Sequence, residues 1–232
     1  MKIRIKIRII MLYIIATPLG NLEDISSRAL KTLREVNMIL AEDTRRTKKL
    51  LSHFQISKPL FSYQHHSSDA AKEKILENLQ NSKSIALVTD AGTPGISDPG
   101  NELIDFLLKK NPEISIIPIP GPSAVATALS ISGFKANQFQ FLGFLPKKGK
   151  TKVYKQILES KMTTVFFESP FRIHKTMADL AKLAPDRKAV ICREMTKIFE
   201  EFKRGTLAEL TEKINVAQKG EITVVIEARS KK

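Results

Sequence analysis

The 232-residue sequence has little cysteine and no long apolar run. Cys192 is its only cysteine, so no disulfide can form within the chain, which favours a reducing, cytoplasmic compartment. Cys192 lies in the apolar run 189–192, where a thiol is usually part of the core and seldom a nucleophile. The apolar run 9–16 is far shorter than the ~20 residues that span a bilayer. The sequence therefore predicts a cytoplasmic protein without a membrane segment.

Several signatures of known chemistry are also missing. A G-x-G-x-x-G spacing is absent, which excludes the usual dinucleotide fingerprint, and so is the G-x-S-x-G of serine hydrolases. Residues 143–151 approach a P-loop, but five residues separate Gly143 from Gly149 where that motif needs four. The four histidines are not accompanied by other zinc-ligating residues at the spacing of a zinc site. No metal site is expected.

What the sequence has in excess is positive charge. Its net charge is +14, with a pI near 9.8. Seven cations lie close to the two termini, and without them the rest of the chain still carries +7. A basic excess of this size favours a polyanionic partner and predicts that binding depends steeply on salt.

Apolar runs and helical periodicity alternate along the chain. Buried strands are predicted at 11–16, 36–41, 84–89, 114–119, 139–144, 163–168, 188–193 and 221–227. Amphipathic helices are predicted at 25–36, 70–79, 103–108, 124–129, 153–158, 173–183 and 207–216. This alternation indicates an α/β fold with mostly parallel pairing in the first half and more antiparallel character in the second.

Three prolines mark the expected domain boundary. Pro118, Pro120 and Pro122 alternate at the end of a predicted strand, and proline cannot donate a hydrogen bond to a strand ladder. We therefore predict an N-terminal extension at 1–10, an N-terminal α/β domain at 11–119 and a C-terminal α/β domain at 120–232.

Polar clusters follow the predicted strands at the points where the strands end. They are 17–21, 41–46, 89–100, and the pair 167–172 and 193–197. In open α/β sheets ligands bind at the carboxyl ends of strands. Either Asp24 or Ser26 is expected to cap the helix that follows the first cluster.

The third cluster, TDAGTPGISDPG, is built of small residues and turn-formers. Gly92, Gly95 and Gly100 permit positive φ and a close approach of the backbone to a ligand. Asp90 and Asp98 offer two carboxylates that can orient hydroxyl or amino groups. An ordinary strand–helix connection is the competing interpretation of this loop.

Two charged segments also have competing interpretations. Glu42 and Asp43 beside Arg45 and Arg46 form either a surface ion network or a substrate-handling group. The basic stretch 147–152 is either a loop that contacts nucleic-acid phosphates or a solvated run of charge.

The succession ATPLGN, AEDTRRT, TDAGTPGISDPG, PIPGPSA, FLGFLP, FFESPFR and REMTK resembles the ribosomal RNA small subunit methyltransferase I family. This family belongs to the tetrapyrrole-methylase-like group of S-adenosylmethionine (AdoMet) enzymes, and the resemblance extends over 11–228. It implies two α/β domains of the tetrapyrrole methylase type with AdoMet in a cleft between them, and a homodimer. It also implies 2′-O-methylation of a cytidine in the decoding region of 16S ribosomal RNA, on the 30S subunit.

The resemblance also implies site residues. AdoMet contacts are expected at Leu19, Gly20, Asp90, Ala91, Gly92, Ile96, Ser123, Ala124, Phe167, Glu168 and Met195. Asp43 is the first candidate for the base that accepts the hydroxyl proton, with Glu42 and Asp90 behind it. Independently of the resemblance, the residues proposed to hold RNA phosphates are Arg45, Arg46, Lys147, Lys148, Lys150 and Arg172. The competing interpretations pair Asp43 with Arg45 and make Asp90 a cap of the following turn.

Two departures from family patterns matter for function. The first loop reads ATPLGN, where the tetrapyrrole enzymes have a Gly-rich turn ending in Asp, and many ribosomal members carry a helical tail that is missing here. The alternative functions are methylation of a tetrapyrrole carbon and non-catalytic binding to the ribosome. The basic surplus and the AEDTRRT segment argue against a tetrapyrrole substrate.

Overall fold

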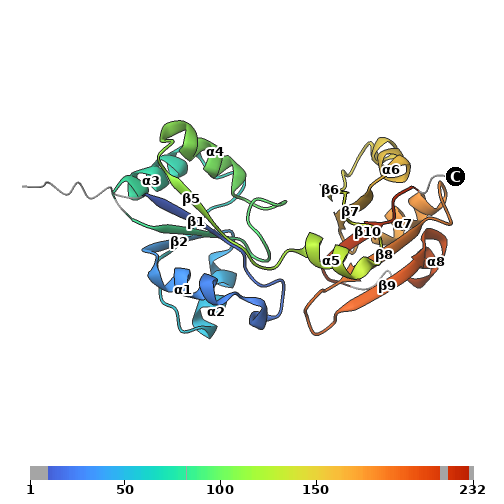
Figure 1. Cartoon of the computed structure of the whole chain (residues 1–232), viewed down its shortest axis with the longest axis horizontal. Coiled ribbons are helices and arrows are strands. Elements are labelled where there is room, and N and C mark those ends of the chain that lie inside the picture. The colour runs from blue at the N-terminus through green and yellow to red at the C-terminus, as the bar shows by residue number, and fades with distance from the viewer. Residues whose placement is uncertain (1–9, 82, 215–218, 230–232) are drawn as a thin grey trace, which may run out of the picture. The chain divides into compact units, whose positions relative to one another are not determined.

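The chain forms two compact units in the computed structural model, which describes residues 10–81, 83–214 and 219–229 (Figure 1). The first unit comprises Leu22–Pro122 and the described part of Met1–Pro18. The second comprises Leu19–Asn21 and the described part of Ser123–Lys232. The units thus divide after Pro122, whereas the proline pattern predicts a boundary three residues earlier, after Ile119. All of the predicted extension at 1–10 except Ile10 lies outside the described residues.

The first unit is built on a five-stranded sheet in the order β3-β2-β4-β1-β5, and every pair in it is parallel. Its strands are β1 (Met11–Ile15), β2 (Met38–Ala41), β3 (Leu60–Ser62), β4 (Ile85–Val88) and β5 (Ser115–Ile119). Its helices are the 3-10 turn η1 (Leu22–Asp24), α1 (Ser27–Glu35), α2 (Thr44–His53), α3 (Asp69–Gln80) and α4 (Asn101–Lys110). The parallel pairing predicted for the first half is confirmed.

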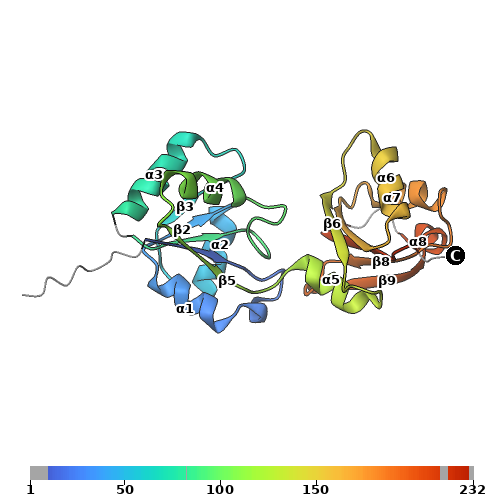
Figure 2. The ribbon, with the colours of Figure 1, turned by 45° about the horizontal axis from the view of Figure 1, so that its top comes forward.

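Helices cover both faces of this sheet, as Figure 2 shows, so the inner strands β2 and β4 are buried on both sides and read as continuous apolar runs. On one face α1 and α2 pack Ala29, Leu33 and Leu51 against the sheet. On the other face α3 and α4 contribute Leu79 and Leu103 to a separate cluster.

Side-chain caps fix where α1 and α2 begin. Ser26 accepts a hydrogen bond from the Ala29 N–H at 3.0 Å, so of the two predicted caps of α1 it is Ser26 that serves. Asp43 caps α2 in the same way, accepting from the Arg45 N–H at 2.8 Å. The start of α2 is therefore tied to a residue of the second polar cluster.

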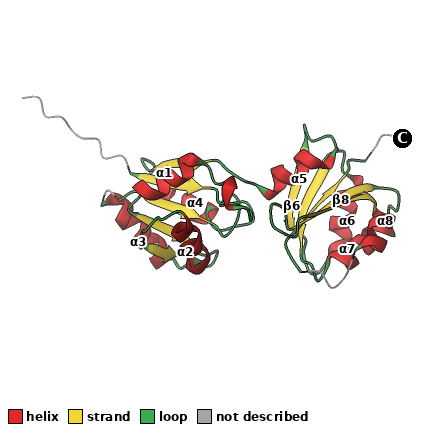
Figure 3. Cartoon of the chain, turned by 90° about the horizontal axis from the view of Figure 1, so that it is seen from below, coloured by secondary structure: helices red, strands yellow, loops and turns green. Residues whose placement is uncertain are grey.

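The second unit has a mixed sheet in the order β6-β7-β10-β8-β9 (Figure 3). Its strands are β6 (Phe139–Phe144), β7 (Thr163–Glu168), β8 (Lys188–Arg193), β9 (Glu201–Thr206) and β10 (Ile222–Ile226). Only β6 and β7 pair in parallel. Its helices are α5 (Ala124–Ser132), α6 (Lys150–Glu159), α7 (Ile173–Ala181) and α8 (Leu207–Lys213).

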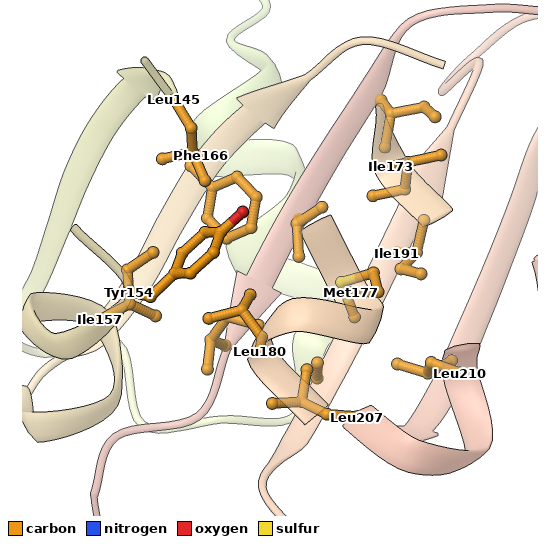
Figure 4. Packing of buried hydrophobic residues seen from close by; sticks show 14 residues of the cluster. Leu145, Tyr154, Ile157, Phe166, Ile173, Met177, Leu180, Ile191, Leu207 and Leu210 are labelled. Atoms are coloured by element: carbon orange, nitrogen blue, oxygen red, sulfur yellow. The ribbon is translucent and has the colours of Figure 1, made fainter. Parts of the chain in front are cut away.

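Each face of the second sheet also has its own core. Tyr154, Met177 and Leu207 come from α6, α7 and α8 and belong to one apolar cluster with Phe166 of the sheet (Figure 4). On the opposite face α5 packs against a cluster that includes Cys192, which is fully buried. The expectation that Cys192 is a core residue is confirmed, and burial raises the pKa of its thiol to about 12.

Three strand ends of the second unit meet at one edge. Ile222, at the start of β10, pairs in antiparallel register with both Glu168 and Arg193, the last residues of β7 and β8. Phe144, the last residue of β6, pairs with Phe167. The two segments of the fourth polar cluster therefore lie at the same edge of this sheet.

Candidate functional site

The carboxyl edge of the first sheet gathers the polar clusters of the first unit. Because its strands are parallel, the loops after β1, β2 and β4 all open at this edge. An isolated bridge joins two of them: the Thr17 N–H donates to Gly92 O at 2.8 Å, and the Gly92 N–H donates to Thr17 O at 3.0 Å. The Thr17 hydroxyl also donates to the Thr89 carbonyl at 3.1 Å.

The three carboxylates that were candidates for the base lie together at this edge. The Asp43 N–H donates to Asp90 Oδ1 at 3.0 Å. Glu42 Oε2 accepts from the Thr89 hydroxyl at 3.1 Å and from the Asp90 N–H at 3.4 Å. Residues 42–43 and 89–90, far apart in the sequence, thus form one hydrogen-bonded group.

Asp43 is held by Arg45. The Arg45 guanidinium donates to Asp43 through Nε at 3.1 Å and through NH2 at 2.8 Å, in addition to the backbone cap. Hydrogen bonding to this guanidinium is the main reason that the pKa of Asp43 lies well below its usual range. The pairing of Asp43 with Arg45 is observed, and it makes Asp43 a weak proton acceptor at neutral pH.

The pKa of Asp90 is shifted in the opposite direction from that of Asp43. Partial burial raises its pKa, and the nearby charge of Glu42 raises it further, while the Asp43 N–H and Arg46 lower it. Arg46 NH1 lies 3.2 Å from Asp90 Oδ2. Asp90 therefore holds a proton more readily than a free aspartate, although it has a cationic partner.

Asp98 belongs beside these residues, although the sequence-based set of site residues omits it. Burial, followed by the charge of Glu42, raises its pKa to about 6. Asp98 lines a hollow of about 240 Å³ together with Tyr63 and His65. The sequence does place Asp98 in the same loop as Asp90, which is a signal that it could belong to the site. Its burial, however, depends on residues that are distant in the sequence.

The loop that carries Asp90 and Asp98 takes the backbone shape predicted for its glycines. Gly92, Gly95 and Gly100 have φ of 85°, 83° and 150°, which glycine adopts without strain. A Cβ on Gly95 would lie 2.6 Å from Asn101 Oδ1, and the Asn101 side chain donates to the Gly95 carbonyl at 2.8 Å. Ile96 in this loop is 41% exposed.

In the second unit Glu168 ends β7 and is fully buried. Its carboxylate accepts from the Ser169 N–H at 2.7 Å and from the Thr176 hydroxyl at 2.8 Å, and it forms an ion pair with Arg172. Arg172 also donates to the Leu145 carbonyl at 3.1 Å. The charges of Glu168 and Arg172 are thus largely satisfied within the unit.

The other residues expected to contact AdoMet in the second unit are small or apolar. Ser123 and Ala124 begin α5, and Ser123 makes no side-chain capping bond among the described residues. Met195 is buried beside α5, and the ring of Phe167 lies 4.9 Å from that of Phe141. Leu19 and Gly20 belong to this unit too, where the next residue, Asn21, donates its N–H to Thr196.

The expected RNA-binding residues are spread over both units. Arg45 and Arg46 are exposed on α2, whereas Lys147 and Lys148 are exposed in the connection between β6 and α6, and Lys150 begins α6. Within the described ranges, no group of three or more metal-ligating side chains could hold a metal ion. No described helix is both long and apolar enough to cross a membrane.

Comparison with known proteins places this geometry in a family. A family model described as Tetrapyrrole (Corrin/Porphyrin) Methylases matches residues 11–211. The ribosomal RNA small subunit methyltransferase I of Thermotoga maritima is 45% identical over 220 residues, covering 94% of this chain and 98% of that protein. The protein of the same name from Halalkalibacterium halodurans is 45% identical over 224 residues, covering 95% of this chain and 77% of that protein.

Solved structures support the fold at much lower identity. A diphthine synthase superposes with a TM-score of 0.73 at 17% identity, covering 94% of this chain and 90% of that one. A cobalt precorrin-4 methyltransferase of cobalamin biosynthesis gives 0.66 at 17% identity, covering 94% and 95%. The predicted two-domain α/β fold of the tetrapyrrole methylase type is confirmed, and the chain belongs to the tetrapyrrole methylase family and, within it, to the ribosomal RNA small subunit methyltransferase I family.

Proposed function

We propose that this protein transfers a methyl group from AdoMet to the 2′-oxygen of a cytidine ribose in the decoding region of 16S ribosomal RNA. The observation that carries the proposal is the 45% identity to ribosomal RNA small subunit methyltransferase I proteins over 94–95% of the chain. The net charge of +14 supports a polyanionic substrate. Selection of a ribose hydroxyl would also let the enzyme distinguish RNA from DNA.

The predicted cofactor residues fit a donor of this kind. AdoMet supplies an electrophilic methyl on a sulfonium, so the protein's contribution is binding, alignment and proton handling. The N-terminus of α5 at Ser123 and Ala124 offers backbone N–H groups suited to the donor's carboxylate. The backbone around Gly92 allows close approach. The residues proposed to contact the donor are Asp90, Ala91, Gly92 and Ile96 in the first unit, and Leu19, Gly20, Ser123, Ala124, Phe167, Glu168 and Met195 in the second.

Glu168 would act in that site through its backbone. Its carboxylate already has the Ser169 N–H, the Thr176 hydroxyl and Arg172 as partners. Direct binding of the donor by this side chain would require one of these partners to be displaced, which leaves a buried charge poorly compensated.

The proton of the ribose hydroxyl would be accepted by one of the carboxylates beside Thr89, at the carboxyl edge of the first sheet. A base is most effective when its pKa lies near the working pH, and such catalysis contributes roughly 10²–10⁴-fold. Asp43, the first candidate from the sequence, is held ionised by Arg45, whereas the pKa of Asp98 is about 6. We therefore place Asp98 first as the acceptor, with Asp90 next, and assign Glu42 and Asp43 to positioning.

The cofactor site can be tested at Gly92. A Gly92→Asp variant should lose AdoMet binding in calorimetry, because a carboxylate would enter the space expected for the donor. Gly133→Asp is a matched control: Gly133 also has positive φ, at 76°, but an added Cβ there would meet nothing within 4 Å among the described residues. Normal AdoMet affinity in a folded Gly92→Asp protein would show that the donor binds elsewhere.

The reaction itself can be tested with methyl-tritiated AdoMet. The purified protein should label 16S ribosomal RNA in 30S particles. The label should lie next to a phosphodiester linkage that resists alkaline hydrolysis, because its ribose has lost the free 2′-hydroxyl. Label that appears only in a tetrapyrrole acceptor would instead support a carbon methyltransferase. Binding to 30S particles without incorporation would indicate a non-catalytic ribosome-binding protein. Homodimerisation stays a prediction, which sedimentation equilibrium would check.

A further inference from the structure

The two helical layers of the first unit differ sharply in charge. Together α1 and α2 contain seven basic residues and one acidic residue, and the seven are exposed: Arg28, Lys31 and Arg34 on α1, and Arg45, Arg46, Lys48 and Lys49 on α2. We call this surface the basic face. On the opposite side of the sheet α3 and α4 contain four basic and five acidic residues. Because α1 and α2 lie on one side of the sheet and α3 and α4 on the other (Figure 1), the excess of positive charge in this unit is concentrated on one side.

The cations of the α3–α4 layer are largely neutralised by neighbours. Lys72 lies 3.1 Å from Asp69, and Lys109 lies 2.7 Å from Asp105. A further pair, between Lys110 and Glu73 at 2.7 Å, links α4 to α3. This layer offers a polyanion little uncompensated charge.

The cations of the basic face have fewer acidic partners. Lys48 and Lys49 have no carboxylate within ion-pair distance among the described residues. Arg28 and Arg34 donate to the backbone carbonyls of Pro118 and Phe54, which leaves their charge uncompensated. The ammonium groups of Lys48 and Lys49 and the remaining N–H donors of Arg28 and Arg34 can bind phosphates.

The basic face also begins at the carboxylate site. Asp43 caps α2, and the first turn of the helix supplies Arg46, which lies 3.2 Å from Asp90. The whole of α2 spans ten residues, about 15 Å at 1.5 Å per residue, with Lys48 and Lys49 exposed along it. A strand whose target ribose lies at the carboxylates would therefore have phosphates within reach of this helix.

We propose that the basic face binds the phosphate backbone of the RNA substrate beside the target nucleotide, an inference that rests on the proposed function. The face extends the expected contacts of Arg45 and Arg46 to Lys48 and Lys49 on α2 and to the exposed cations of α1. It recognises the backbone by charge and contributes no base-specific contact. The α3–α4 layer stays outside the interface.

The test is charge reversal on the two layers. Lys48→Glu with Lys49→Glu alters the basic face, and Lys74→Glu with Lys109→Glu is the matched control, since both change the net charge equally and all four lysines are exposed. Binding to an RNA with the sequence of the 16S decoding region is measured over a series of salt concentrations. The first variant should bind at least tenfold more weakly at low salt. Its log–log salt slope should fall by about 1.4 to 1.8, as for the loss of two phosphate contacts.

The controls separate the possible failures. AdoMet affinity, measured by calorimetry, should be the same in both variants and in the parent protein. An equal loss of RNA binding in the control variant, or none in the basic-face variant, would overturn the inference. Binding to phosphatidylglycerol vesicles that is tighter than RNA binding and is lost with Lys48 and Lys49 would assign the face to a membrane surface instead. If the parent protein binds RNA but does not methylate it, the proposed function fails while the basic face stands.

Discussion

Asp90 and Glu168 follow or end an apolar strand at a sheet edge, one in each unit, yet their surroundings give them different roles. The Asp90 side chain is 22% exposed, and burial with the charge of Glu42 raises its pKa. The Glu168 side chain is fully buried and ion-paired. The comparison shows that a carboxylate at a strand end marks a site of chemistry only where its neighbours leave it reactive.

The partners of the two carboxylates explain the contrast. Glu168 has an arginine, a hydroxyl and a backbone N–H as partners, all from its own strand end and the helix that follows. Asp90 shares its surroundings with two further carboxylates, Glu42 and Asp98. Like charges brought together favour protonation, which is a property that general bases use.

Removing the proposed base is the most decisive test of this contrast between a reactive and a structural carboxylate. Asp98→Asn should lower methyl transfer by roughly 10²–10⁴-fold, because the amide cannot accept the hydroxyl proton. Methyl transfer to 30S particles under single-turnover conditions measures the effect, with Asp105→Asn on the exposed side of α4 as the control. Full activity in Asp98→Asn would remove Asp98 from proton handling.

Removing the second carboxylate should affect stability instead. Glu168→Ala should lower the free energy of unfolding by about 3 kcal/mol, the low end for a broken buried pair, because Arg172 keeps some solvent exposure. Urea unfolding measures this change, with the exposed Glu159→Ala as the matched control. A stability loss no greater than that of the control would contradict a structural role for Glu168.

The pH dependence should separate activity from stability. Because Asp98 must be ionised to accept a proton and its pKa is about 6, single-turnover methyl transfer should fall about tenfold per pH unit below pH 6. The folded state favours protonated Asp98, so this residue's contribution to stability decreases as the pH rises from about 4 through 6.

Asp98→Asn should therefore flatten both profiles. The variant should be somewhat more stable than the parent at pH 8, where the parent keeps a partly buried charge that the amide lacks. Unfolding curves at pH 5 and pH 8 measure the change. A variant that is less stable than the parent at pH 8 would show that the ionised carboxylate is well compensated in the fold.

The smallest effect is expected at Asp43. Asparagine caps helices about as well as aspartate, and exposed ion pairs contribute less than about 1 kcal/mol. Asp43→Asn should thus change stability little and leave methyl transfer within roughly tenfold of the parent, since Asp43 is already held by Arg45. A kinetic defect as large as that of Asp98→Asn would indicate that Asp43 is the base.

Most of the fold could be predicted from apolar periodicity. All eight predicted strands occur, because each is an apolar run; most are buried within a sheet, whereas β5 and β6 are edge strands. The elements without a prediction have weak patterns: β3 has three residues, and β9 is a partly exposed edge strand. Helix α2 has four cations and only two leucines in ten residues, so its apolar stripe is too narrow to stand out.

The candidate site could be predicted in part. Parallel strands bring the loops after β2 and β4 to one edge, so the meeting of residues 42–43 with residues 89–90 follows from topology. Which carboxylate is reactive does not follow from topology. The lowered pKa of Asp43 depends on the direction of the Arg45 side chain, and the raised pKa of Asp98 depends on burial.

Mapping ribose methylation in 16S ribosomal RNA tests the central claim most directly. Cells that lack this gene are compared after supply of the parent gene or of the Asp98→Asn variant. The parent should restore one alkali-resistant cytidine linkage in the decoding region, and the variant should leave it unmodified at equal protein levels. An unchanged methylation map with and without the parent gene would contradict the assignment as a ribose methyltransferase of the small subunit.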